Sequence, residues 1–174
     1  TRSSSGAGKY DGEMVLAISW QPAFCENARR KRECRSQNAT RYDATHFALH
    51  GLWPQSRSNI YCGVSAEQDR LDISGKWSRL DIARLPQDLW DRLRITMPGT
   101  QSGLHRHEWV KHGTCYSADA ETYYEDSLAL MDAINASSVQ ALFAGAIGTP
   151  LTNAQVRNGF DAAFGKGVGD RVRL

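Results

Sequence analysis

The chain has 174 residues, of which 41% are hydrophobic and 23% are charged, and its formal net charge is +2 at pH 7. This composition excludes a disordered chain and fits one globular domain, spanning 1–174, that buries a sizeable core. The longest apolar runs, 14–18 and 141–147, fall well short of the ~20 residues that a membrane-spanning helix needs. We therefore expect no membrane association.

The N-terminal residues 1–9 are mostly small and polar, with neither an initiator Met nor an apolar stretch. We expect a flexible segment and a processed start from which any export signal has been removed.

Two segments have the apolar or alternating patterns of β-strands, 13–20 and 45–52. Helical spacing of apolar residues follows later in the chain, at 86–97, 120–134 and 153–164. Pro86 would open the first of these helices and Pro98-Gly99 would end it. Ser117 or Asp119 would cap the second, and Thr152 with Gln155 would cap the third. Strands and helices without a regular strand-helix repeat predict an α+β fold.

Four cysteines in an even count, without C-x-x-C spacing, favour disulfides over zinc or redox chemistry. They are Cys25, Cys34, Cys62 and Cys115, and the count allows three pairings. Disulfides imply an oxidising compartment, so we expect a secreted or periplasmic protein. The alternative is four reduced thiols in a cytosolic protein. Residues 29–32 form a very basic run that we expect to be a solvated loop rather than a phosphate site.

The segment 46–55 reads His-Phe-Ala-Leu-His-Gly-Leu-Trp-Pro-Gln. Strand alternation would place His46 and His50 on the same face. Gly51 and Pro54 suit a turn directly afterwards. The pattern thus predicts that His50 lies at a strand end and faces a cleft.

The segment 105–115 reads His-Arg-His-Glu-Trp-Val-Lys-His-Gly-Thr-Cys. At ~100° per helical residue, four ionisable groups share one face. They are His107, Glu108, Lys111 and His112. We expect Gly113 to end this helix and Cys115 to tie its end to another segment.

His-Glu followed by a nearby His suggests a zinc protease, whose pattern is His-Glu-x-x-His. In this chain Lys111 stands at the position of the second zinc-binding histidine. A charged ammonium is a poor ligand and repels a dication, so we expect no metal and no other cofactor.

Two imidazoles, an ammonium and a carboxylate suit cleavage of a phosphodiester by its own neighbouring hydroxyl. That reaction needs a base, an acid and positive charge beside the phosphorane oxygens. Imidazoles serve both proton roles near neutral pH. Lys111 supplies the charge, and Glu108 can orient a partner or favour an imidazolium. The residues alone leave other reactions open.

His50-Gly51-Leu52-Trp53-Pro54 and the segment 107–115 together resemble the two active-site signatures of the ribonuclease T2 family. Ser19-Trp20-Gln21-Pro22 with Phe24-Cys25 is similar to the first strand of that family. The resemblance covers 13–135. It implies an α+β fold with a central antiparallel sheet flanked by helices.

The resemblance also implies a metal-independent endoribonuclease that cleaves single-stranded RNA to 2',3'-cyclic phosphates and then to 3'-phosphates. It assigns His112 as the first base and His50 as the first acid. His107 would bind the phosphate, and Glu108 with Lys111 would stabilise the transition state.

Trp53 and Tyr61 match family positions that stack on a substrate base, which suits weak base discrimination. The resemblance implies a Cys62–Cys115 disulfide, and Cys25–Cys34 is then the remaining pair. We expect the protein to be a monomer that binds RNA as its substrate. An inhibitor protein cannot be inferred from the sequence.

Two other classes stay open. A metal-dependent hydrolase would lose activity with a chelator. An inactive RNA-binding or effector relative would show no turnover. The remaining tryptophans are expected to pack in the core or at an interface; they are Trp20, Trp77, Trp90 and Trp109.

Overall fold

The structure is a computed structural model that describes residues 9–56, 58–81 and 83–174. The predicted flexible segment 1–9 therefore lies outside the described residues, apart from Lys9. None of the helices within the described ranges is both long and apolar enough to span a membrane.

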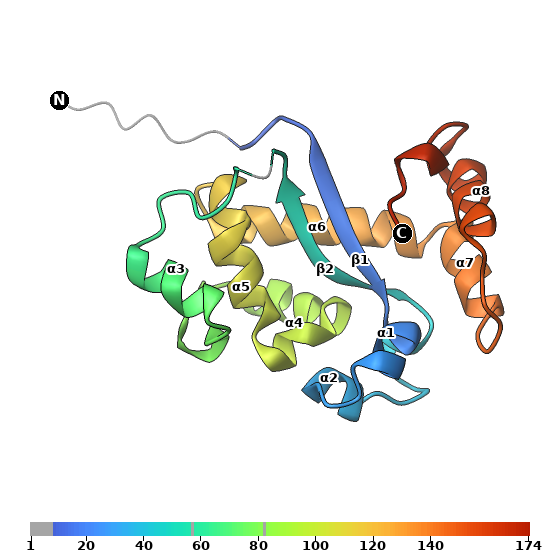
Figure 1. The fold of residues 1–174 in the computed structure, drawn as a ribbon, viewed down its shortest axis with the longest axis horizontal. Coiled ribbons are helices and arrows are strands. Elements are labelled where there is room, and N and C mark those ends of the chain that lie inside the picture. The colour runs from blue at the N-terminus through green and yellow to red at the C-terminus, as the bar shows by residue number, and fades with distance from the viewer. Residues whose placement is uncertain (1–8, 57, 82) are drawn as a thin grey trace.

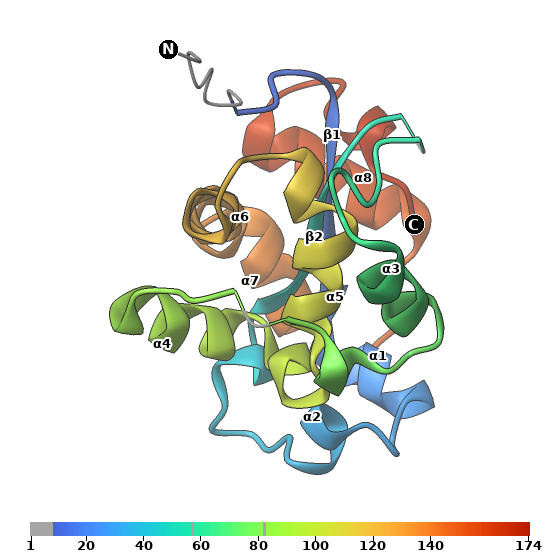
Figure 2. The same ribbon diagram turned by 90° about the vertical axis from the view of Figure 1, so that its left-hand side faces the viewer.

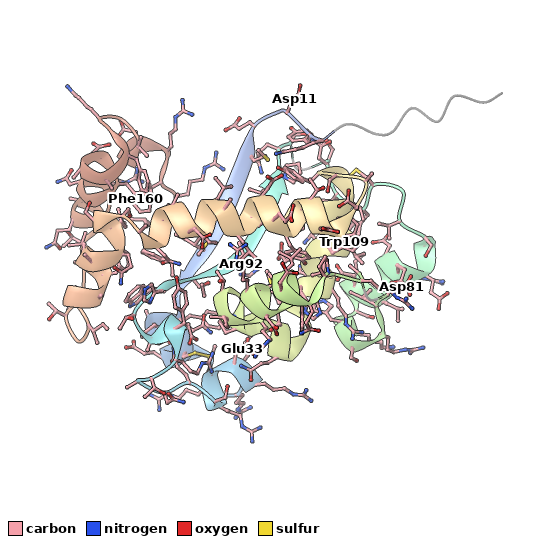
Figure 3. The ribbon with its side chains drawn as sticks, turned by 180° about the vertical axis from the view of Figure 1, so that it is seen from behind. Asp11, Glu33, Asp81, Arg92, Trp109 and Phe160 are labelled. Carbon is pink, nitrogen blue, oxygen red and sulfur yellow. A yellow bond between two sulfur atoms is a disulfide. The ribbon has the colours of Figure 1, made fainter. Side chains whose placement is uncertain are left out.

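Two antiparallel strands, β1 (Met14–Trp20) and β2 (Phe47–Pro54), form a small sheet at the centre of the fold (Figure 1). Both predicted strands are confirmed within two residues of their expected ends. The apolar side chains of β2 that enter the core pack against helices α4 (Gln87–Thr96) and α6 (Ala120–Asn135). Seen from behind in Figure 3, α6 lies across the sheet with α4 beside it. The α+β prediction is confirmed.

A β-bulge interrupts the register of the sheet at His50. Ala17 pairs with Gly51, whereas the next residue of β1, Ile18, pairs with Leu49. His50 is thus an extra residue on β2. Because of it, Leu49 and Leu52 both reach the core although three positions separate them. Bulges bend a strand and redirect side chains, and they are frequent beside active sites.

The predicted helices are present, and their caps are the expected ones. Pro86 is the N-cap residue of α4, and the side chain of Asp119 accepts a hydrogen bond from the Thr122 backbone at the start of α6. Thr152 and Gln155 form a capping box at the start of α8 (Asn153–Phe164). The helix predicted around 105–112 is α5 (Leu104–Lys111).

Four further α-helices were not predicted: α1 (Gln21–Asn27), α2 (Arg32–Arg35), α3 (Ala66–Ile73) and α7 (Ser138–Gly145). Figure 2 shows α5 running beside β2, with α3 on the outer side of α5. Short 3-10 turns lie at Tyr42–Ala44, Trp77–Arg79, Pro98–Ser102, Gly113–Cys115 and Gly169–Arg171.

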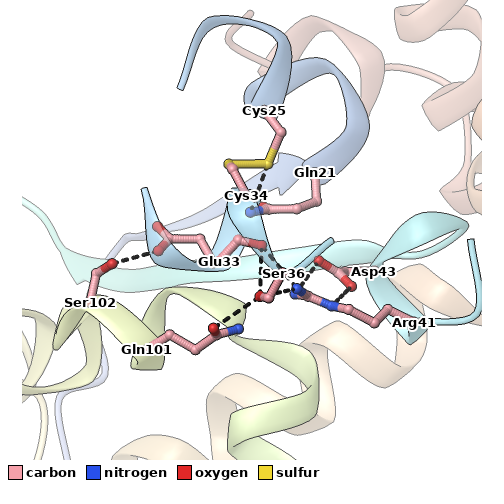
Figure 4. The surroundings of a disulfide bond; sticks show 9 residues. All are labelled: Gln21, Cys25, Glu33, Cys34, Ser36, Arg41, Asp43, Gln101 and Ser102. Atoms are coloured by element: carbon pink, nitrogen blue, oxygen red, sulfur yellow. Dashed lines mark hydrogen bonds and ion pairs between the residues drawn. A yellow bond between two sulfur atoms is a disulfide. The ribbon is translucent and has the colours of Figure 1, made fainter. Parts of the chain in front are cut away.

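The loop between α1 and α2 is closed by a disulfide between Cys25 and Cys34 (Figure 4). Beneath it, the buried carboxylate of Glu33 accepts a hydrogen bond from Ser102. Arg41 donates to both carboxylate oxygens of buried Asp43, at 2.9 and 2.8 Å. The basic residues 29–32 are all exposed, as expected of a solvated loop.

Two side chains of α6 each form hydrogen bonds with both the N–H and the carbonyl of one residue of β2, as the backbone of a neighbouring strand would. Asn135 accepts from the Phe47 N–H at 2.8 Å and donates to the Phe47 carbonyl at 3.0 Å. The hydroxyl of Tyr123, which is fully buried, accepts from the Leu52 N–H and donates to the Leu52 carbonyl, both at 3.1 Å. The helix therefore holds β2 on either side of the bulge.

We predict that Tyr123→Phe lowers the free energy of unfolding by about 1–3 kcal/mol, because the Leu52 N–H and carbonyl would be left unpaired in the core. Urea denaturation at neutral pH measures this. Tyr42→Phe is the matched control, since Tyr42 is 37% exposed; it should change stability by no more than about 0.5 kcal/mol. An equal effect of both substitutions would contradict the role of the Tyr123 hydroxyl.

Candidate active site

Glu108 lies at the centre of the site and is fully buried on α5. Its Oε2 accepts a hydrogen bond of 2.8 Å from Trp53 Nε1 on β2. Its Oε1 lies 3.3 Å from His50 Nε2 and 3.8 Å from His107 Nε2. These are ion-pair distances without hydrogen-bond geometry, so Oε1 has no hydrogen-bond donor among the described residues. One carboxylate thus joins the helix to the strand.

Gly51 permits this close approach of α5 to β2. A Cβ atom at position 51 would lie 1.9 Å from Glu108 Oε2 and 2.7 Å from Trp53 Nε1. Both distances are far below van der Waals contact, so any side chain would displace the hydrogen bond between Trp53 and Glu108. The glycine of the His-Gly-Leu-Trp segment is therefore required by packing rather than by a turn.

His112 is the C-cap residue of α5, and its backbone N–H donates to the Glu108 carbonyl at 3.0 Å. Its ring stacks on Trp53, with centroids 5.3 Å apart and planes at 29°. His50 approaches the same indole edge-on, at a centroid distance of 5.7 Å. Trp53 therefore contacts both imidazoles.

Burial lowers the pKa of His112 to about 4. The nearby carboxylate of Glu108 opposes this shift, and the positive charges of Lys111, His107 and His50 add to it. The ring is therefore neutral over the mildly acidic and neutral range. A neutral imidazole can accept a proton.

His107 is held on two sides by residues that the motifs did not include. Its Nδ1 lies 2.7 and 2.9 Å from the two carboxylate oxygens of Asp72, which is 3% exposed. Its ring stacks on Trp77 at a centroid distance of 4.5 Å and an interplanar angle of 18°. The rings of His107 and His112 are 6.4 Å apart.

Tyr61 lies beside Asp72 and is fastened to the end of α5. Its backbone N–H donates to the Lys111 carbonyl at 2.9 Å, and its hydroxyl donates to Asp72 at 2.8 Å. The next residue, Cys62, forms a disulfide with Cys115, the pairing that the resemblance implied. Burial and the hydrogen bond to Asp72 raise the pKa of Tyr61, so its hydroxyl stays protonated.

A cleft of about 1270 Å³ opens at this end of the sheet. The site residues that line it are His50, Trp53, Lys111 and His112. It continues along β1 to the segment 170–173, which includes Arg171 and Arg173. The half-exposed imidazole of His50, with 41% of its side chain accessible, can reach a ligand in this cleft.

The model of the ribonuclease T2 family matches residues 11–170. The chain belongs to the ribonuclease T2 family. The resemblance inferred from the motifs is thereby confirmed, and it extends further toward the C-terminus than those motifs indicated.

Several relatives are bacterial and plant ribonucleases. Ribonuclease I of Escherichia coli (strain K12) is 30% identical over 190 residues, which cover 93% of this chain and 66% of the relative. Extracellular ribonuclease LE of Solanum lycopersicum is 28% identical over 153 residues, covering 84% and 62%. Ribonuclease S-2 of Nicotiana alata is 29% identical, covering 73% and 53%. The chain thus spans from about half to two thirds of these proteins.

The structure brings the two signature segments of this ribonuclease T2 chain together. His50, His107 and His112 lie close to Glu108, and His50, Lys111 and His112 line the cleft. Trp53 donates to Glu108 and contacts the rings of His50 and His112, whereas Tyr61 contacts Asp72. Among the described residues, no group of three or more His, Cys, Asp and Glu side chains has an arrangement that could hold a metal ion.

One expectation needs correction: His50, expected at a strand end before a turn at Gly51 and Pro54, lies inside β2, which continues to Pro54. Trp77, expected to pack in the core or at an interface rather than to contact substrate, packs on the ring of His107. Gly113 directly follows His112, the C-cap residue of α5, and begins a 3-10 turn. Its lack of a side chain serves packing, because a Cβ there would lie 2.3 Å from the ring of Trp109.

Asp72 was not identified from the sequence. It lies on α3, a helix that the apolar pattern did not predict, and no motif places it near His107. Its neighbours Leu71 and Ile73 are apolar. A carboxylate between two apolar residues was the one available signal, and it does not indicate a partner.

We predict that Gly51→Ala lowers stability by about 1–3 kcal/mol through overpacking and breaks the hydrogen bond between Trp53 and Glu108. Thermal and urea unfolding measure the loss, and Trp fluorescence reports the changed surroundings of the indole. Gly145→Ala is the control, because an added Cβ there meets no atom within 4 Å. It should be neutral or stabilise slightly. Equal stability of the two variants would refute the proposed packing role.

Proposed function

We propose that this chain is a metal-independent endoribonuclease that cleaves single-stranded RNA by transphosphorylation, with low base specificity. One observation carries the proposal: two imidazoles that both contact Trp53 line a single cleft with Lys111, and burial keeps one of them, His112, neutral. A base, an acid and a fixed positive charge are the groups that this reaction needs.

In the proposed reaction, neutral His112 takes the proton of the ribose 2'-hydroxyl, and the 2'-oxygen attacks the adjacent phosphorus. Protonated His50 gives its proton to the 5'-oxygen that leaves, so that a 2',3'-cyclic phosphate forms. In the second step the roles reverse: His50 takes a proton from water, the water oxygen attacks the cyclic phosphate, and His112 protonates the 2'-oxygen. The product ends in a 3'-phosphate.

Lys111, His107 and Glu108 would stabilise the charges that form during the reaction. Lys111 and His107 would bind the non-bridging phosphate oxygens, which gain negative charge in the transition state. The carboxylate of Glu108 lies 3.3 Å from His50 Nε2 and so can offset the charge of the imidazolium. We place Trp53 and Tyr61 as the aromatic surfaces on which a base stacks, Tyr61 through its ring because its hydroxyl is bound to Asp72.

We further propose that the protein acts as a secreted or periplasmic monomer formed by one domain. Two disulfides support an oxidising compartment. The name of one relative, extracellular ribonuclease LE, supports export.

The pKa of His112 predicts the acid limb of the pH profile. The folded-state value, about 4, lies below the ordinary 6.5, so the base becomes available as the pH rises through about 4. We expect kcat/KM for a dinucleoside phosphate to rise there and to fall again at higher pH, because the reaction also needs a protonated acid. An acid limb centred near the ordinary value would show that His112 is not a buried base.

His112→Ala tests the reaction class. With RNA and EDTA, the unsubstituted protein should form 2',3'-cyclic phosphate ends, and the variant should be slower by about 10²-fold or more. His46→Ala is the matched control, because His46 stacks on Tyr42 before the start of β2 and should keep full activity. A DNA oligonucleotide should remain intact. Loss of cleavage in EDTA would support a metal-dependent hydrolase, and absence of any cleavage would support the inactive relative.

A further inference from the structure

The segment from Tyr61 to Trp77 places three side chains around His107. Asp72 contacts Nδ1 through both carboxylate oxygens, and Trp77 covers one face of the ring. Tyr61 donates its hydroxyl to Asp72 at 2.8 Å, and Trp77 Nε1 donates to the Asp72 backbone carbonyl at 3.3 Å. All three therefore meet at Asp72 or at the ring that it binds.

This segment is anchored to the helix that carries His107. At one end, the Tyr61 N–H bonds to the Lys111 carbonyl, and Cys62 is joined to Cys115. In its middle, α3 packs against α5. Asp72 is 3% exposed, so its side chain has little freedom to turn away from the ring. The contact between Asp72 and His107 is thus part of a rigid frame.

The contact determines which nitrogen of His107 is available to a ligand. An ionised carboxylate only accepts hydrogen bonds, so Nδ1 must carry a proton and donate it to Asp72. Stacking on Trp77 opposes rotation of the ring. Nε2 is then the free nitrogen, and it lies on the side of Glu108, 3.8 Å from Oε1. An imidazole whose Nδ1–H is engaged can donate from Nε2 only when it is doubly protonated.

We propose that Asp72 is a positioning residue for phosphate binding: it accepts the Nδ1–H of doubly protonated His107 and, together with Trp77, directs the Nε2–H toward the phosphate. This inference rests on the proposed function, since it assumes that His107 meets a phosphate oxygen. Asp72 itself does not touch the substrate. Its carboxylate also accepts the Tyr61 hydroxyl, and the proposed effect on phosphate binding passes through His107, which distinguishes it from a buried carboxylate that merely stabilises the fold.

A double-mutant cycle tests this distinction. Asp72→Asn should lower kcat/KM for RNA cleavage by roughly 10- to 100-fold, the range known for carboxylates that orient metal-bound histidines. In the His107→Ala background the same substitution should change kcat/KM by less than about twofold, because its effect passes through the missing ring. Glu67→Gln, an exposed charge removal on the same helix, is the control that should leave activity unchanged.

Equal losses from Asp72→Asn in both backgrounds would overturn the proposal, because a general structural defect would act with or without His107. A second measurement does not depend on activity or on a variant. Nitrogen NMR of the histidine side chains in the unsubstituted protein should show His107 protonated at Nδ1 when it is neutral. A neutral His107 that carries its proton at Nε2 would also overturn the proposal.

The same pair of measurements separates this inference from the proposed function. Protein that shows the Nδ1–H form of His107 but does not cleave RNA would disprove the ribonuclease proposal and leave the hydrogen-bond arrangement intact. Protein that cleaves RNA but whose neutral His107 carries its proton at Nε2 would retain the ribonuclease proposal and disprove the role of Asp72.

Discussion

The buried carboxylate of Glu108 is the interaction on which the rest of the site depends. A charge without solvent contact is costly unless it is paired or hydrogen-bonded. The indole of Trp53 donates to one oxygen of Glu108, and the imidazoles of His50 and His107 lie 3.3 and 3.8 Å from the other. Because these partners come from both β2 and α5, satisfying the carboxylate brings the two signature segments together. The electrostatic requirement of one residue thus determines the geometry of the site.

Three features of the fold around Glu108 allow the strand and the helix to pack closely at the site. The extra residue in β2 lets the strand keep Leu49 and Leu52 in the core while His50 reaches the cleft. Hydrogen bonds from α6 hold the strand on both sides of this irregularity. Gly51 then leaves the space that the carboxylate needs. A strand of regular pleat would place position 50 and position 53 on opposite faces, and no shared site would form there.

The two histidines proposed for proton transfer differ because their surroundings differ. His112 is enclosed against Trp53 and close to other positive charges, which lowers its pKa. His50 is more exposed and lies beside the carboxylate. Burial and neighbouring charge thus favour the neutral form of His112. This neutral form suits the base that we propose.

The sequence by itself determined the local features. Periodicity and caps predicted both strands and the helices α4, α5, α6 and α8, because these depend on residues close in the chain. The two signatures identified the family and the proposed catalytic set. Tertiary structure alone decided the bulge at His50, the lowered pKa of His112 and the contacts of Asp72 and Trp77 with His107. These arise from atoms that are distant in sequence and adjacent in space, and side-chain burial cannot be read from spacing along the chain.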